Sequence, residues 1–333
     1  MKNNHTLTYI PVINTLRGIA ALLVVFYHFI YTTTDYVENK ALLTISSYGN
    51  LGVTIFFVIS GIVIPLAMIK HKYKVSDLWF FLKKRAIRIE IPYLAAMGLS
   101  ILYLIARNYI PSSVGPSLVP DFREIIYNIF YLVPFNENIK WINPVFWTLA
   151  LEFQYYIFLA FFFPFFINKK LINRLLLYGV VFMTGYLFPY HLFKILPIFM
   201  IGILYALFLT KKVQLAELVL VYLTIILFMI WTDYSMLKVT VAIITVLVVH
   251  LFKNNHTKIG DFFGNISYSL YLLHVITGGA LINLLTHHFT APVEKFFVIV
   301  SGILFSILCA YIFYRIVEKP AKDLSSNYKR YNK

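Results

Sequence analysis

A few ionisable side chains lie inside otherwise apolar stretches of this sequence. An ionisable group in apolar surroundings is costly unless it is paired, so each one is a candidate for function. Three lie near the ends of their stretches, where contact with the aqueous boundary explains them simply: Arg17, Glu90 and His250. Three lie deeper: His28, Glu152 and His274. Imidazole and carboxylate groups can take and give protons, so acid–base chemistry is the first candidate.

The spacing of Arg17 and His28 suits one side of a helix. They are eleven residues apart in the segment INTLRGIAALLVVFYHF. In an α-helix this separation is three turns plus about 20°, so both side chains point the same way, about 16 Å apart along the axis. Arg17 would lie near one end of the helix and His28 in its middle or further half.

Glu152 is the candidate partner of His28. It lies six residues after Phe146, about 9 Å into an apolar segment, whereas His28 lies about 22 Å from a helix start at Ile13. If the two helices run in opposite directions through a layer of about 30 Å, these depths match. A carboxylate beside a histidine fixes its tautomer and makes a workable general base. The alternative for His28, Glu152 and His274 is that each makes a structural hydrogen bond between helices.

The composition shows what surrounds these residues. Of 333 residues, 60% are apolar and 13% are charged, and the mean hydropathy is +0.77. A soluble domain averages about 45–50% apolar and about 25% charged residues. A soluble enzyme, a disordered chain and a secreted disulfide-rich protein are therefore excluded, and the single cysteine, Cys309, allows neither an intramolecular disulfide nor a cysteine metal cluster. We predict an all-α integral membrane protein.

Helical spans of a bilayer need about 20 apolar residues each. About ten segments qualify, which predicts a bundle of about ten transmembrane helices. Their ranges are roughly 13–33, 49–69, 89–107, 146–166, 172–190, 192–210, 217–234, 236–252, 266–286 and 296–316. The fifth and sixth are separated only by Pro189, Tyr190 and His191, so one broken helix is the alternative there.

The charge distribution predicts the orientation. The net charge of +15 comes from 29 Lys and Arg against 14 Asp and Glu. Loops on the cytoplasmic side of a membrane collect Lys and Arg. With the N-terminus in the cytoplasm, every inner loop is at least as basic as its outer neighbours. We therefore expect cytoplasmic N- and C-termini in a multi-pass protein of the plasma (inner) membrane, with no nucleic acid as a partner.

The loops leave little room for a soluble domain. The longest, Asn108–Val145, is below the size at which domains usually fold alone. Within it, residues 121–134 are expected to form a short interfacial helix on the outside. Lys83–Arg88 predicts an amphipathic segment on the inner surface. We expect a single transmembrane domain over residues 1–333, with no appended soluble domain.

Familiar soluble-enzyme motifs are missing from the sequence. It contains no serine elbow, zinc-ligand spacing, Walker loop or GxGxxG. Ser60 and Gly61 stand together in FFVISGIVI, where the pair favours close helix packing over nucleophilic catalysis.

Six segments, in order, resemble the signatures of the acyltransferase 3 family of polytopic membrane O-acyltransferases. They are INTLRGIAALLVVFYHF (13–29), FFVISGIVI (56–64), FLKKRAIRIEIP (81–92), FWTLALEFQYYIFLAFFFP (146–164), ISYSLYLLHV (266–275) and YRIVEKPAKDL (314–324). Together they span residues 13–324, nearly the whole chain. The sequence departs from the family pattern at Asn14 and Thr15, where Asp-Gly is usual, and at Thr148, where Ser is usual. None of these changes removes a proposed chemical group.

The resemblance implies transfer of an acyl group, usually acetyl, from cytoplasmic acyl-CoA to a hydroxyl. The acceptor is commonly a glycan or a polyisoprenoid-linked sugar, which suits the biosynthesis of a bacterial cell envelope or exopolysaccharide. On this basis His28 is the general base, Glu152 orients it and Arg17 helps to position the donor. An acyl-histidine relay is the alternative path.

The expected donor site lies on the inner side of the membrane. CoA is an anion, and cations cluster where it would arrive. These are Lys83, Lys84, Arg85 and Arg88. Acetyl-CoA is the expected donor, and no metal is expected.

Two other functions compete with this interpretation. A transporter or flippase of a polyisoprenoid-linked glycan would also need many spans, but such proteins often show inverted repeats, and no such pairing is visible here. A structural subunit of a glycan export or polymerisation complex would leave the buried His and Glu without a role. Proteins of glycan assembly are candidate partners of the enzyme.

Overall fold

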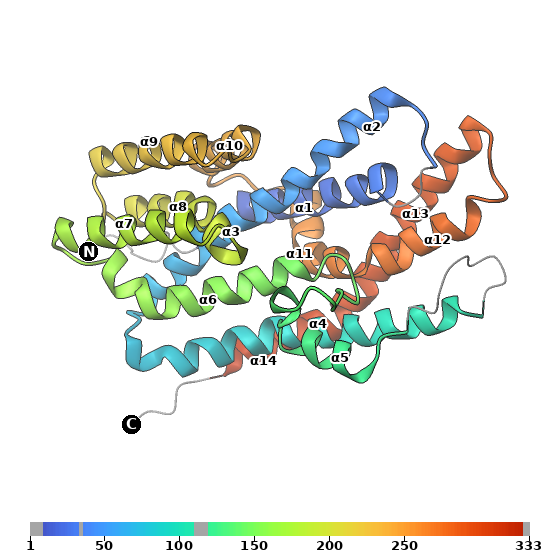
Figure 1. Cartoon of the computed structure of the whole chain (residues 1–333), viewed down its shortest axis with the longest axis horizontal. Helices are drawn as coiled ribbons and strands as arrows, with labels where there is room; N and C mark the ends of the chain where they lie inside the picture. The colour runs from blue at the N-terminus through green and yellow to red at the C-terminus, as the bar shows by residue number, and fades with distance from the viewer. Residues whose placement is uncertain (1–8, 33–35, 110–118, 329–333) are drawn as a thin grey trace. The chain divides into compact units, whose positions relative to one another are not determined.

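The computed structural model describes residues 9–32, 36–109 and 119–328, which form helices and no strand. Short π-helical turns (Tyr27–Thr32, Val275–Gly279, Tyr314–Glu318) and 3₁₀ turns (Tyr48–Asn50, Val75–Asp77, Val133–Phe135) flank the α-helices. The α-helices in Figure 1 are α1 (Val12–Phe26), α2 (Lys40–Ser47), α3 (Leu51–Lys70), α4 (Leu78–Arg107), α5 (Phe122–Ile129), α6 (Trp147–Phe166), α7 (Leu171–Leu187), α8 (His191–Leu209), α9 (Leu215–Trp231), α10 (Met236–Leu251), α11 (Lys258–Leu273), α12 (Ala280–Leu285), α13 (Pro292–Phe313) and α14 (Lys319–Asn327).

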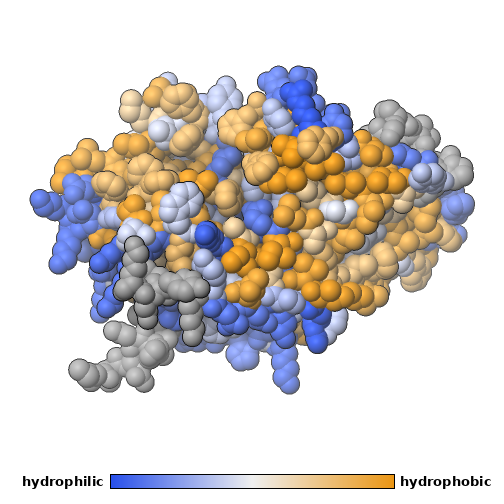
Figure 2. Space-filling view, turned by 90° about the horizontal axis from the view of Figure 1, so that it is seen from below, coloured by the Kyte–Doolittle hydropathy of each residue, from blue (hydrophilic) through white to orange (hydrophobic). Residues whose placement is uncertain are grey.

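Many of these helices are apolar enough to cross a membrane. In the described ranges six helical stretches are also long enough, and α11 with α12, bent by 52°, is a seventh if the pair is one span. The apolar helices α7, α9 and α10 are shorter. Hydrophobic side chains cover much of the surface seen in Figure 2, as contact with lipid requires. Each of the ten predicted spans coincides with one of these helices, while the number that cross the membrane and the side of the termini stay predictions.

The fifth and sixth predicted spans are two separate helices, so the alternative of one broken helix is wrong. After α7, Phe188 has φ −128° and ψ 68°, because a residue before a proline is disfavoured in the helical conformation. His191 then begins α8 with φ 50°. α7 and α8 contact each other along the hairpin that results.

The chain forms two compact units of interleaved segments. Unit 1 comprises Met1–Ala20, Leu51–Leu82 and Leu151–Gly264, and unit 2 comprises Ala21–Asn50, Lys83–Ala150 and Asn265–Lys333. Four helices, α1, α4, α6 and α11, contribute residues to both units.

The core of unit 1 is α8, which packs closely against α3 (Figure 1). Glycines let the two backbones approach: a Cβ on Gly61 would collide with the Phe199 carbonyl, and one on Gly202 with the Val58 carbonyl. Small residues at helix contacts are a common packing device in membranes. The packing role predicted for Gly61 is confirmed.

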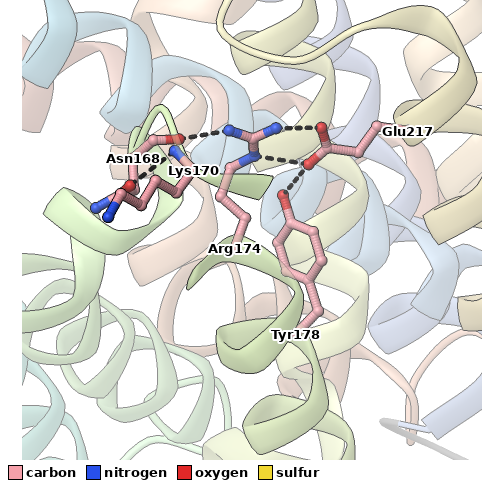
Figure 3. Close-up of polar contacts among 5 residues, drawn as sticks. All are labelled: Asn168, Lys170, Arg174, Tyr178 and Glu217. Atoms are coloured by element: carbon pink, nitrogen blue, oxygen red, sulfur yellow. Dashed lines mark hydrogen bonds and ion pairs between the residues drawn. The ribbon is translucent and has the colours of Figure 1, made fainter. Parts of the chain in front are cut away.

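A buried ion pair joins α7 to α9 in unit 1 (Figure 3). Arg174 donates from Nε to Glu217 Oε1 (2.8 Å) and from Nη2 to Oε2 (2.5 Å), and both side chains are less than one-tenth exposed. The Tyr178 hydroxyl donates to Glu217 Oε1 (3.1 Å), and Arg174 Nη1 donates to the Asn168 carbonyl. Nearly every polar atom drawn in this cluster thus meets a partner, which a buried charge pair requires.

In unit 2 the segment after α5 folds back along α4. The eight-residue α5 begins with a capping box between Asp121 and Glu124, which confirms a helix in residues 121–134, although a shorter one. Tyr93 on α4 donates its hydroxyl to the Asn128 carbonyl (2.7 Å). Residues 110–118 of the long predicted loop lie outside the described residues.

The basic inner segment is not a separate element. Lys83–Arg88 belongs to α4, which runs without interruption for 30 residues from Leu78. The predicted start of that span at residue 89 is therefore too late, because the apolar residues Leu78–Leu82 extend the helix before the basic stretch.

The Arg174–Glu217 pair gives a test of stability. Arg174→Ala leaves a buried carboxylate without its cation, and breaking a buried pair in this way costs about 3–5 kcal/mol. We expect a clearly lower Tm in detergent for this variant. The double variant Arg174→Met/Glu217→Leu removes both charges and should recover most of the loss. An unchanged Tm for Arg174→Ala would contradict the role given to the pair.

Candidate active site

His28 lies in a π-helical turn that follows α1. The turn covers Tyr27–Thr32, so the α-helical spacing used to relate Arg17 to His28 holds only as far as Phe26. The His28 ring places Nδ1 3.0 Å from the Val24 carbonyl oxygen, and its side chain is half-buried. Such π-helical turns occur often at functional sites.

The helix that carries His274 breaks at this residue. α11 ends at Leu273, a π-helical turn follows over Val275–Gly279, and the two stretches are bent by 52°. Side chains bond to the carbonyls just before the bend. His274 Nδ1 lies 3.0 Å from Leu270 O and 2.9 Å from Tyr271 O.

Two further side chains continue this pattern. Asn143 donates from Nδ2 to Leu272 O (3.1 Å), and Thr277 donates from Oγ1 to Leu273 O (2.8 Å). Four successive carbonyls at the bend therefore have side-chain partners. This compensation matters because a polar backbone group buried without a partner costs free energy.

The two histidines meet in unit 2, although they lie 246 residues apart in the chain. His274 Nε2 is 3.1 Å from His28 Nδ1, and the ring centroids are 4.9 Å apart. His274 is fully buried, and its ring lies near those of Phe29 (6.0 Å) and Tyr271 (6.1 Å). Sequence analysis named both histidines but missed their pairing.

Glu152 has its printed partners within unit 1. Its Oε1 accepts hydrogen bonds from the Ser60 hydroxyl (3.0 Å) and from the Tyr156 hydroxyl. The bond to Ser60 links α6 to α3, so Ser60 has a polar role beside the packing role of Gly61. Because His28 belongs to unit 2, its predicted orientation by Glu152 stays a prediction.

Arg17 lies on the part of α1 that belongs to unit 1, where α1 packs tightly against α11. A Cβ on Gly18 would come within 2.6 Å of the Phe263 Cβ, and one on Gly264 would collide with the Asn14 carbonyl. Asn14 also donates to Asp261 Oδ1 (3.2 Å). The unusual residue at position 14 therefore joins the two helices.

The four predicted donor-site cations lie in the unit 2 part of α4. Lys83 is exposed, while Lys84, Arg85 and Arg88 are half-buried. Lys84 and Arg88 are four residues apart and so share one side of the helix. The Ser325 hydroxyl of α14 donates to the Lys84 carbonyl (2.8 Å), which packs the C-terminal helix against this stretch.

Other acidic and basic groups in the helices have partners that suit structural roles. Glu90 accepts from the Tyr131 hydroxyl (3.1 and 3.3 Å), and His250 lies 3.3 Å from the Tyr205 hydroxyl. Glu318, which sequence analysis did not select, is buried and accepts from both Ser269 N (3.1 Å) and Ser269 Oγ (2.5 Å). The EKP stretch after an apolar span was the only available signal for it.

A metal site finds no support in the described part of the chain. No group of three or more His, Cys, Asp or Glu side chains there could hold a metal ion. The expected absence of a metal stays a prediction.

Comparison with known proteins gives the family. The model of the acyltransferase domain matches residues 10–315. Proteins of Staphylococcus aureus strains COL, MSSA476 and MRSA252, provisionally named O-acetyltransferases, are 32% identical over 165 residues. That region is 45% of this chain and 24% of each relative, so the match spans about a quarter of their length. No solved structure matches the chain.

The family match covers nearly the whole chain and agrees with its apolar helices. The resemblance seen in the six sequence segments is thereby confirmed. The chain is a multi-pass membrane protein that carries an acyltransferase domain, and it belongs to the acyltransferase 3 family.

Proposed function

We propose that this chain is a membrane O-acyltransferase. It would move an acyl group, acetyl in the first instance, from cytoplasmic acyl-CoA to a hydroxyl of a glycan or polyisoprenoid-linked sugar in cell-envelope biosynthesis. The observation that carries the proposal is a half-buried histidine, His28, in a π-helical turn of a chain of this family. The name of the staphylococcal relatives supports acetyl as the group transferred.

The His28 ring is the proposed general base. It takes the proton of the acceptor hydroxyl while the oxygen bonds to the thioester carbonyl carbon. The carbon–sulfur bond then breaks, and the CoA thiolate leaves and receives the proton from His28. Glu152 and Arg17 are proposed to orient the base and the donor, respectively.

The basic stretch of α4 is the proposed donor site. Its four cations would hold the phosphates of CoA, for which arginine forks are well suited. Their spacing on one helix supports this role, because half-buried cations form stronger bonds to phosphate than fully solvated ones. Lys83, Lys84, Arg85 and Arg88 form this site.

The proposed setting completes the assignment. Residues 1–333 form one acyltransferase domain with about ten spans, cytoplasmic termini and a place in the plasma (inner) membrane. The excess of Lys and Arg in alternate loops supports this topology. Proteins of glycan assembly are the proposed partners.

Removal of the base should abolish transfer. In liposomes with acyl-labelled acetyl-CoA and a crude extract of polyisoprenoid-linked sugars, we expect His28→Ala to lose about 10²–10⁴-fold in rate, the usual contribution of a general base. His250→Ala is the matched control, because His250 contacts Tyr205 in the other unit. Full transfer by a folded His28→Ala would sink the assignment. CoA-independent export of the sugars would favour the transporter.

Removal of the donor-site cations should weaken binding more than chemistry. Each bond from a charged side chain contributes about 1.5–3 kcal/mol, so Arg85→Ala/Arg88→Ala should raise the KM for acetyl-CoA at least about tenfold. The kcat should change much less. Lys253→Ala/Lys258→Ala removes two exposed cations elsewhere and should leave KM unchanged. Equal KM values for both double variants would contradict a donor site on α4.

A further inference from the structure

We propose that His274 is a positioning residue that holds His28 in the tautomer needed for proton abstraction. This role rests on the proposed function of His28 as the base. It follows from the hydrogen-bond partners of four ring nitrogens in unit 2, and it explains why two buried histidines meet at a bend in a helix.

The proton of His274 is placed by two carbonyls. Its Nδ1 lies 3.0 Å from Leu270 O and 2.9 Å from Tyr271 O. A carbonyl oxygen can only accept, so Nδ1 must carry hydrogen. In a neutral imidazole the other nitrogen then has a lone pair, and this nitrogen, Nε2, faces His28.

The proton of His28 is placed by the same reasoning. Its Nδ1 lies 3.0 Å from Val24 O and 3.1 Å from His274 Nε2. An unprotonated Nδ1 would turn its lone pair toward the carbonyl oxygen. His28 Nδ1 therefore carries hydrogen and is shared between two acceptors. The basic lone pair of the neutral ring is then on Nε2.

This tautomer has a chemical consequence. When His28 Nε2 takes a proton from the acceptor hydroxyl, the ring becomes an imidazolium ion. Its Nδ1–H then donates a charge-assisted bond to His274 Nε2, and such bonds are about twice as strong as neutral ones. His274 thus performs, without a charge, the orienting task that a carboxylate performs in a Ser-His-Asp triad.

The bend in α11 keeps His274 in place. The adjacent Tyr271 hydroxyl is 2.7 Å from Thr148 Oγ1 and donates to Val145 O (3.2 Å). Both of the carbonyls that hold the His274 ring belong to the last turn of α11. A ring held on one edge by the backbone and on the other by His28 has little freedom to rotate.

Two variants separate this role from a purely structural one. His274→Gln can keep an acceptor oxygen near the position of Nε2, whereas His274→Phe keeps the ring and removes the acceptor. We expect His274→Phe to lower kcat about 10- to 100-fold with the KM for acetyl-CoA unchanged. His274→Gln should retain most of the kcat. Full kcat in folded His274→Phe, with His28→Ala inactive, would overturn the positioning role alone.

A spectroscopic test needs no altered His274. In protein labelled with ¹⁵N-histidine in liposomes, the His28 signals, identified by their loss in His28→Ala, should show hydrogen on Nδ1 and a lone pair on Nε2. Hydrogen on Nε2 in the neutral ring would overturn the inference. Full transfer by His28→Ala would instead overturn the proposed function, whichever tautomer the spectrum shows.

Discussion

The bend between α11 and α12 is the feature on which unit 2 depends. Backbone carbonyls inside a membrane protein must have partners within the protein, since lipid offers none. At this bend the carbonyls of residues 270–273 accept from the side chains of His274, Asn143 and Thr277. One of these compensating groups, His274, also contacts His28. The break in the helix and the candidate site are thus one arrangement.

Charged and polar side chains elsewhere in the helices follow the same constraint. Glu152 accepts from two hydroxyls, Glu318 accepts from the backbone and side chain of Ser269, and Arg174 pairs with Glu217. Each carboxylate links helices that are distant in sequence. In lipid such groups stabilise the fold only when they are paired, so they define which helices are neighbours.

The positions of the helices could be predicted from sequence, because apolar runs of about 20 residues are a strong signal. The close approach at Gly61 and the helix within residues 121–134 were also predictable, from a small residue and from a capping box. The starts of α4 and α11 were not. Polar residues near each start hid the first turns, so both predicted spans begin too late.

That error explains why the histidine pair was missed. His28 lies sixteen residues after Val12 and His274 sixteen residues after Lys258, the first residues of their helices. With the predicted start at residue 266, His274 would lie only about 12 Å into its span, while His28 lies about 22 Å into its own. Helices that are apolar on every side also lack the periodicity that would show which faces meet.

The three π-helical turns also restrict how the chain can change in length. In such a turn each hydrogen bond spans one residue more than in an α-helix. Loss of one residue would close the turn into regular α-helix and rotate everything beyond it by about 100°. All three turns lie in the unit that holds the histidine pair. Substitution is open to these helices, but insertion and deletion have to fall in the loops between them.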